Sequence, residues 1–160
     1  MTTPDTPQLA FQEYYPEHQS HCYGCGRLNE HGLRIMTYWD GDETLTRFTP
    51  QPFHTAVPGI VYGGLLASLI DCHSTGSAAA AIYRGEGRSM RSDPPVRCVT
   101  GSLNVRYLKP TPLGPEIEIR GVVTEVKGRK VTITSTLSVD GVACVTGEVV
   151  ALRLTDEFVL

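Results

Sequence analysis

Hydrophobic and polar residues alternate along much of this 160-residue chain, and one long segment breaks the alternation. That segment, residues 63–83, has no proline and few β-branched residues but much leucine, isoleucine and alanine, so it predicts a long helix. Segments that alternate or are rich in strand-forming residues predict strands over 33–39, 43–48, 99–108, 116–126, 131–139 and 142–154. Turn signals such as Asp40-Gly41-Asp42 and Asp140-Gly141 separate them. The pattern predicts an α+β fold of two strands, one helix and roughly four antiparallel strands.

The predicted helix has no wide polar face, so the strands that follow it must bury it. One narrow stripe of small or polar residues follows the i, i+3, i+4 spacing: Gly64, Ala67, Ser68, Asp71, Ser74, Thr75 and Ala78. Such a stripe indicates a cleft or a close contact between chains. Asp71 is its lone carboxylate, and an ionised acid in an apolar helix is costly unless it is paired or used.

Besides Asp71, the start of this helix is a second candidate part of a functional site. Gly63 and Gly64 lack side chains, so an acyl carbonyl could approach the N–H groups that have no acceptor within the helix. The alternative is a tight turn from loop to helix. Asp71 could act on water or on a carbonyl carbon, the alternative being a structural acid bonded to Ser68, Ser74 or the backbone. Together these features indicate acyl-group chemistry.

Composition limits the other classes of function. A chain that is 41% hydrophobic and 19% charged is typical of one globular domain, and a net charge of −3 gives no electrostatic reason to expect nucleic acid. We expect a flexible N-terminal arm over residues 1–20 and one domain over 21–155. No apolar run approaches the roughly 20 residues that a membrane span needs. The first residues show no signal-peptide pattern, so we expect a cytoplasmic protein that does not bind membranes.

The five cysteines are expected to be reduced thiols. Cys22 and Cys25 have the C-x-x-C spacing of zinc and redox sites. A zinc site needs two more good ligands, and only His21 and His31 are near in sequence. A packed turn containing glycine is therefore the favoured interpretation, and no metal or redox cofactor is predicted.

Three motifs in order carry a resemblance to a known family: Cys22-Tyr23-Gly24-Cys25-Gly26 … Gly32-Leu33, Tyr62-Gly63-Gly64 … Asp71, and residues 99–112. The chain resembles hotdog-fold acyl-CoA thioesterases of the PaaI type, in which His-Gly-Gly precedes an Asp at the same offset. The resemblance implies a hotdog fold, with a long central helix wrapped by a curved antiparallel sheet. It also implies hydrolysis of an acyl-CoA thioester, with coenzyme A as part of the substrate rather than a cofactor.

The same resemblance implies roles for individual residues. Asp71 would attack the thioester or activate water, and the Gly64 N–H would stabilise the oxyanion. Tyr62 stands where the family has His, and a phenol can donate a hydrogen bond but cannot act as a base near neutral pH. His54 is a near match to a water-orienting residue, and Thr100 matches a Ser or Thr that holds the attacking water. Substrate contacts are expected from Gly63, Ser74, Thr75, Arg106 and Lys109, the last two because coenzyme A carries phosphates.

Helix geometry adds an expectation about assembly. Seven residues separate Gly64 from Asp71 by about 10 Å, so the two groups cannot reach one carbonyl from the same helix. A working site then needs two chains, which agrees with the family, and we expect a dimer or a dimer of dimers. Two alternatives stay open: a non-catalytic acyl-CoA-binding module, and an enoyl-CoA hydratase-like enzyme on the same fold.

Overall fold

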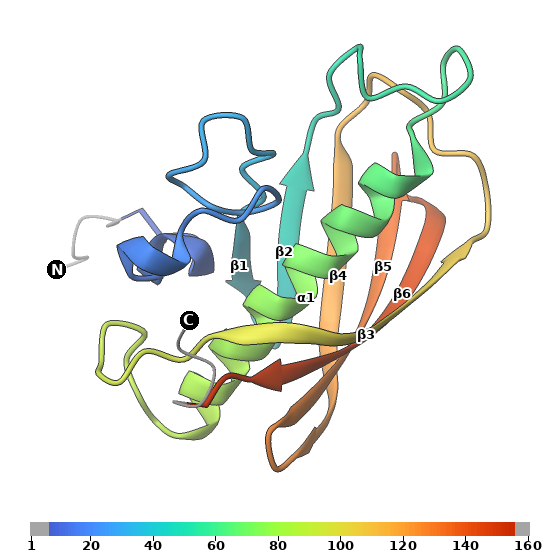
Figure 1. Ribbon diagram of the computed structural model, residues 1–160. Helices are drawn as coiled ribbons and strands as arrows, with labels where there is room; N and C mark the ends of the chain where they lie inside the picture. The colour runs from blue at the N-terminus through green and yellow to red at the C-terminus, as the bar shows by residue number, and fades with distance from the viewer. Residues whose placement is uncertain (1–6, 156–160) are drawn as a thin grey trace, which may run out of the picture.

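The computed structural model describes residues 7–155, in which one six-stranded antiparallel sheet curves around a single long helix (Figure 1). The elements are η1 (Phe11–Tyr14), η2 (Glu17–Gln19), β1 (Thr37–Asp40), β2 (Glu43–Phe48), α1 (Gly63–Gly85), β3 (Cys98–Tyr107), β4 (Ile117–Lys127), β5 (Lys130–Val139) and β6 (Val142–Arg153). The strand order is β1-β2-β4-β5-β6-β3. The predicted fold class is confirmed, and β3, which crosses over from the far end of α1, forms one edge of the sheet.

Short hairpins with the predicted turn residues connect the strands of the second half. Asp140 and Gly141 have φ values of 49° and 77°, the left-handed pair that a two-residue hairpin turn requires. The turn between β4 and β5 uses Gly128 at a φ of 59°. Because these turns fix the register, the alternating apolar residues of β4, β5 and β6 all reach the same face.

The core lies between α1 and that face of the sheet. Leu69 and Ile70 of α1 are fully buried, as are Ile133 and Val149 opposite them on β5 and β6. A Cβ on Gly147 of β6 would stand 2.5 Å from a methyl carbon of Ile70, so the helix approaches the sheet at a point where only glycine fits. Contrary to the expectation from the sequence, α1 is long and apolar enough to span a membrane, but 72% of its most apolar window is buried in the protein, which is typical of a core helix.

The N-terminal segment differs from the flexible arm expected over residues 1–20. Residues 1–6 lie outside the described part, but from Ala10 onward the chain packs on the domain, and Phe11 and Gln12 of η1 are buried. The Gln12 side-chain amide donates to the Thr37 hydroxyl at 3.0 Å and its carbonyl accepts the Thr37 N–H at 2.9 Å. Gly76 of α1 leaves the space that this amide fills. Single buried contacts of this kind leave no periodic pattern in the sequence.

His73 connects α1 to strand β2, at the opposite side of the sheet from β3. Its ring is fully buried and lies between two threonines of β2, with Nε2 3.1 Å from the Thr44 hydroxyl and Nδ1 2.8 Å from the Thr46 hydroxyl. Burial lowers the pKa of His73 to about 3. His73 comes two residues after Asp71 and points to nearly the opposite side of the helix, so it packs against the sheet and not toward the candidate acid.

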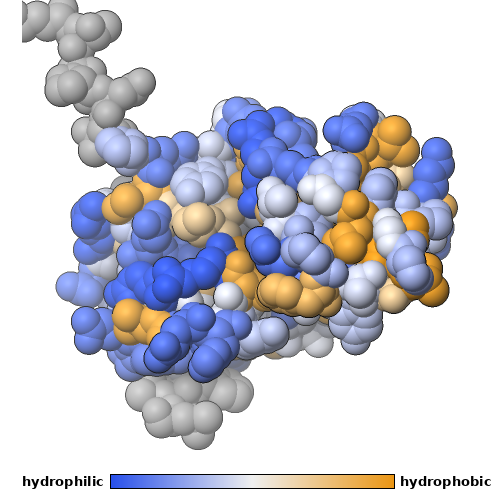
Figure 2. All heavy atoms as spheres, turned by 90° about the horizontal axis from the view of Figure 1, so that it is seen from above, coloured by the Kyte–Doolittle hydropathy of each residue, from blue (hydrophilic) through white to orange (hydrophobic). Residues whose placement is uncertain are grey.

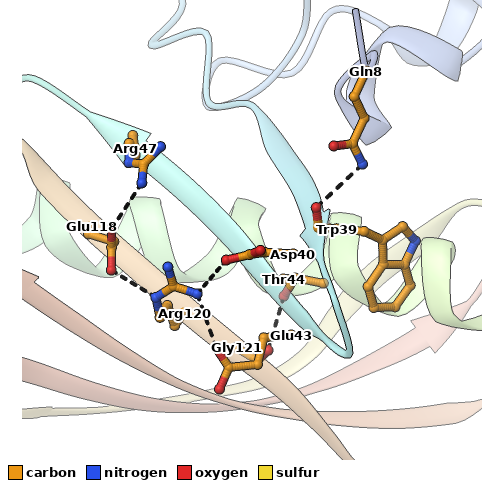
Figure 3. A network of polar contacts seen from close by, with 9 residues as sticks. All are labelled: Gln8, Trp39, Asp40, Glu43, Thr44, Arg47, Glu118, Arg120 and Gly121. Carbon is orange, nitrogen blue, oxygen red and sulfur yellow. Dashed lines mark hydrogen bonds and ion pairs between the residues drawn. The ribbon is translucent and has the colours of Figure 1, made fainter. Parts of the chain in front are cut away.

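The outer face of β1, β2 and β4 carries an ion-pair network centred on Arg120 (Figure 3). Its guanidinium lies 2.8 Å from Asp40, 3.2 Å from Glu43 and 2.8 Å from Glu118. All four side chains are partly exposed, so solvent screens these pairs and each contributes little to stability. The network keeps this face of the sheet polar and distinct from the face that packs on α1.

Candidate active site

A β-bulge in the edge strand β3 brings Thr100 to Asp71. Thr100 pairs with Ala151 and Leu103 pairs with Val149, and the register shifts between Thr100 and Ser102. Both partner residues on β6 are fully buried on the inner face, so Thr100 and Leu103 face α1 although they are three residues apart. The Thr100 hydroxyl donates a hydrogen bond to Oδ1 of Asp71. The structure thus joins two of the predicted catalytic residues.

Asp71 occupies the part of α1 that the sheet leaves half-open. It is half-buried, and among the described residues only Thr100 bonds its carboxylate, so Oδ2 is free to act on a ligand. Ser68 donates instead to the Gly64 carbonyl at 2.9 Å, and Ser74 is buried with its hydroxyl unpaired. The alternative of a structural Asp held by Ser68 or Ser74 is therefore not what the structure shows.

Ser74 and Thr75, expected as substrate contacts, are both buried beneath the domain surface. The Thr75 hydroxyl donates to the backbone carbonyl of Asp71 at 3.3 Å rather than to its side chain. In the single chain neither residue lines an accessible site, because β3 and η1 both pack on this half of the helix. The open half of the stripe runs from Gly64 to Asp71.

The start of α1 presents N–H groups without a side-chain cap. Tyr62 is the N-cap residue and makes no capping hydrogen bond, and the N–H groups of Leu65 and Leu66 turn back to its carbonyl. The Gly63 and Gly64 N–H groups, in the first turn, have no acceptor within the helix. The Tyr62 ring lies over Gly64, where a Cβ would meet it at 2.5 Å. The structure thus places the exposed Tyr62 phenol directly beside the predicted oxyanion hole.

A groove of about 360 Å³ opens beside this helix start. Tyr107 of β3 lines it and donates its hydroxyl to the Gly63 carbonyl at 2.7 Å. No site role was predicted for Tyr107, although its place on the inner face of the predicted strand was a usable signal. The lining is mainly apolar and includes Ile60, Leu66, Leu108 and Lys109.

The two predicted basic contacts fall on different surfaces. Lys109 lines the groove beside Gly63, as expected for a substrate contact. Arg106 lines a separate hollow with Asn104 and Glu148 on the outer face of the sheet, because residues 104 and 106 alternate with the inward-facing Val105. Within one chain Arg106 cannot contact a ligand in the Gly63 groove.

His54 stands apart from Asp71 in the loop before α1. Its Nδ1 accepts the Gln51 N–H at 2.9 Å, and its ring packs against Phe48 and Phe53. Partial burial lowers the pKa of His54 below its ordinary value, so the ring is neutral near pH 7. Its backbone carbonyl accepts the Tyr62 N–H at 2.9 Å, which fixes the loop against the helix start. In the single chain His54 supports the loop and does not orient the acid.

Apolar side chains cluster on the loops around this helix start. Phe53, Val57 and Tyr62 are 76%, 64% and 57% exposed. Seen from above in Figure 2, apolar surface gathers on the right, the side on which Figure 1 shows the loops that lead into α1. Exposed apolar surface of this extent around a groove is typical of a binding or association face.

A long helix wrapped by a single antiparallel sheet, with an acid on its open face and uncapped glycine amides at its start, defines a hotdog protein built for acyl groups. A family model described as the thioesterase superfamily matches residues 58–146, which include both of these features. The chain belongs to the thioesterase superfamily. The family and fold predicted from the sequence are confirmed.

Similar proteins agree with this assignment. A thioesterase superfamily protein from Shewanella loihica PV-4, solved by crystallography, is 43% identical, and the match covers 88% of this chain and 100% of that one with a TM-score of 0.66. The Escherichia coli PaaI protein from the phenylacetic acid degradation operon shares the fold at 13% identity, with a TM-score of 0.62 over 77% of this chain and 81% of that one. Acyl-coenzyme A thioesterase THEM4 from Xenopus laevis is 33% identical over 52% of this chain, which spans only 32% of that relative's length.

Proposed function

We propose that this protein hydrolyses acyl-CoA thioesters at a site formed by two copies of the chain, with Asp71 as the essential acid. The hydrogen bond from Thr100 to Asp71 on the open face of α1 is the observation that carries the proposal. The family, and the names of the THEM4 relatives, support the class of substrate. The mainly apolar groove beside Gly63 suits an acyl or pantetheine chain, and Lys109 at its edge suits a phosphate.

In the proposed reaction, water attacks the thioester carbonyl carbon while Asp71 takes one water proton through its free oxygen. The carbonyl oxygen becomes an oxyanion that the Gly64 N–H of the second chain stabilises, with help from the Tyr62 hydroxyl beside it. The C–S bond then breaks, and the proton held by Asp71 passes to the departing thiolate of coenzyme A. Thr100 keeps the carboxylate aimed at the water. Direct attack by Asp71 is the alternative route: it would expel the thiolate of coenzyme A and leave a mixed anhydride. Labelled water that then attacks the Asp71 carbonyl carbon of this anhydride would leave its oxygen in the Asp71 carboxylate, whereas the general-base route leaves none there.

The edge strand β3 supports assembly of two chains. Nine of its ten residues are partly or fully exposed, and Val99, Leu103 and Tyr107 among them are 42%, 40% and 53% exposed. A long edge with unpaired backbone groups and apolar side chains is a surface that proteins normally cover. Pairing two copies along β3 would set their helices side by side, as the distance between Gly64 and Asp71 requires.

The substitution Asp71→Asn tests the activity. We expect kcat/KM for release of coenzyme A from a panel of acyl-CoAs to fall at least about 100-fold, the low end for loss of a general base. Asp140→Asn is the matched control, because this hairpin acid is exposed and Asn tolerates its left-handed backbone. Unchanged turnover in Asp71→Asn would refute the mechanism. Binding of acyl-CoA without turnover by the wild type would favour a binding module, and hydration of an enoyl-CoA without thiol release would favour a hydratase.

Mixed dimers test the shared site. Asp71→Asn and Gly64→Ala each disable a different half of the proposed site, the second because a Cβ at Gly64 would displace the Tyr62 ring and keep the acyl carbonyl from the Gly64 N–H. If one chain supplies the acid and the other the amide, co-folding equal amounts should restore about one quarter of wild-type activity, since half the dimers are mixed and each has one intact site. If both groups came from one chain, mixing would restore nothing.

We also propose a cytoplasmic location, for which the support is chemical. All five cysteines are free, and four of them are buried. Free thiols in this number fit a reducing compartment. Fractionation of the cells that produce the protein would test this, and recovery from an oxidising compartment would contradict it.

A further inference from the structure

The structure brings three sulfur atoms together where the sequence showed only two. Cys22 and Cys25 come from the loop before β1, and Cys72 comes from the middle of α1. The three Sγ atoms all lie within 4.8 Å of one another, and those of Cys22 and Cys72 are 3.9 Å apart. The expectation of a simple packed turn rested on counting ligands near Cys22 and Cys25 in the sequence, and that count left Cys72 out.

The spacing of the sulfurs matches a shared metal ion. Two thiolates bound to one tetrahedral Zn²⁺, each at about 2.3 Å, lie about 3.8 Å apart. The 3.9 Å between Cys22 and Cys72 is close to that value and nearly twice the length of a disulfide bond. Soft thiolate ligands select Zn²⁺ and similar thiophilic ions. We propose that Cys22, Cys25 and Cys72 form a binding site for one Zn²⁺ ion, with solvent as the fourth ligand beside the partly exposed Cys22.

The loop is shaped to deliver its two sulfurs to the helix. A Cβ on Gly24 would lie 2.3 Å from the Cys72 sulfur, so the loop can meet α1 only through glycine. A Cβ on Gly26 would lie 2.5 Å from the Cys22 nitrogen, and the Gly26 N–H donates to the Cys22 carbonyl at 2.8 Å. This tight turn after the second cysteine places both thiols on one side of the loop.

Charge balance favours the ion. Three thiolates and one Zn²⁺ carry a net charge of −1, which is costly to bury alone. Burial of the Arg97 guanidinium works to lower its pKa, but Tyr15 and the three cysteine sulfurs raise that pKa above its ordinary value. Its guanidinium is held in place over the Tyr15 ring at 4.3 Å and by a 2.9 Å bond to the Cys98 carbonyl. The site with Zn²⁺ and Arg97 is neutral.

Metal binding to the full chain tests the proposal without any activity assay. The protein is reduced, stripped with a chelator, and titrated with Zn²⁺ alone, with bound metal counted by elemental analysis. We expect one Zn²⁺ per chain and a higher melting temperature on binding. Cys25→Ser should weaken binding by more than about 100-fold, since even groups that only support metal ligands are worth about 10- to 100-fold. Co²⁺ in place of Zn²⁺ should give a thiolate charge-transfer band that is weaker in this variant, because one of the three thiolates is lost.

Cys144→Ser is the control, because Cys144 is a buried thiol outside the cluster, and its sulfur bonds the Val142 carbonyl. It should bind Zn²⁺ like the wild type. Equal Zn²⁺ binding by the wild type and Cys25→Ser would overturn the proposal. A thiol count in the unfolded, metal-free protein, made without prior reduction, is a second check. Fewer than five reactive thiols would reveal a disulfide and would also overturn the proposal. Circular dichroism shows whether each variant folds. If Cys25→Ser does not fold, the wild-type titration decides: less than one Zn²⁺ per chain overturns the proposal.

Discussion

Acid should destabilise this protein through the buried imidazole of His73. The ring is fully buried between Thr44 and Thr46, and burial lowers its pKa to about 3. In the unfolded chain the same ring titrates near its ordinary pKa of about 6.5. Between these two values the unfolded state binds one more proton than the folded state, so the free energy of unfolding rises with pH. Titration of His73 therefore has little effect on the free energy of unfolding above about pH 6.5 and lowers it progressively below that pH.

The size of the effect follows from the two pKa values. Between pH 7 and pH 5 the penalty grows by about 2 kcal/mol, and each further pH unit down to about 3 adds about 1.4 kcal/mol. Urea unfolding at pH 7, 6 and 5, at one protein concentration, would measure this loss. In His73→Asn the smaller side chain should lower stability at pH 7, but the loss between pH 7 and pH 5 should shrink by about 2 kcal/mol because no ring titrates there.

The comparison with an exposed histidine isolates the cause. His31→Asn removes an exposed histidine ring and should keep the wild-type dependence on pH. A constant difference between the wild type and His73→Asn from pH 7 to pH 5 would refute the reasoning. That result would mean that His73 is protonated as readily in the folded protein as in the unfolded chain, despite its burial against β2.

Two further pairs of substitutions, each a test variant with its control, probe the site and the core. Thr100→Val should lower kcat/KM about 10-fold or more, because it removes a hydrogen bond to the charged Asp71. Thr100→Ser keeps the hydroxyl and should keep most of the activity. Full activity in the valine variant would contradict a positioning role for Thr100. Gly147→Ala should lower the free energy of unfolding by about 1–3 kcal/mol, because its Cβ meets Ile70. In the control Gly85→Ala no atom lies within 4 Å of the new Cβ, so the free energy of unfolding should change by no more than about 0.5 kcal/mol. Equal losses of stability in the two alanine variants, measured by chemical unfolding, would count against the packing argument.

Local patterns in the sequence predicted the helix and most strands because local chemistry sets them. The helix begins at Gly63 as predicted and ends at Gly85 rather than residue 83, and the Asp140-Gly141 turn lies between β5 and β6. The first strand begins at Thr37 rather than residue 33, because residues 33–36 cover the cysteine loop, with the Leu33 and Ile35 N–H groups bonded to it. Contacts between distant segments decide that boundary, and no local pattern reports them.

The position of Thr100 shows where alternation fails as a guide. Strict alternation with Leu103, Val105 and Tyr107 inward would point Thr100 away from Asp71. The resemblance to a family named it, and the bulge at Gly101 explains how it faces the acid. An isolated glycine within a strand is a signal for such a bulge. The sequence thus contained the cue, but only the pairing with β6 shows which residues the bulge turns.

Three consecutive residues of α1 connect the proposed chemistry to the rest of the fold. Successive helix positions point about 100° apart, so Asp71, Cys72 and His73 reach three different elements. Asp71 meets Thr100 on the edge strand, Cys72 meets the cysteine loop, and His73 meets β2. The rotation of the helix, and hence the direction of the carboxylate, is therefore fixed on two sides by buried contacts that never touch a substrate. Changes at Cys72 or His73 should then disturb catalysis through the orientation of Asp71, with kcat affected more than KM, because the groove beside Gly63 lies two turns away on the same helix.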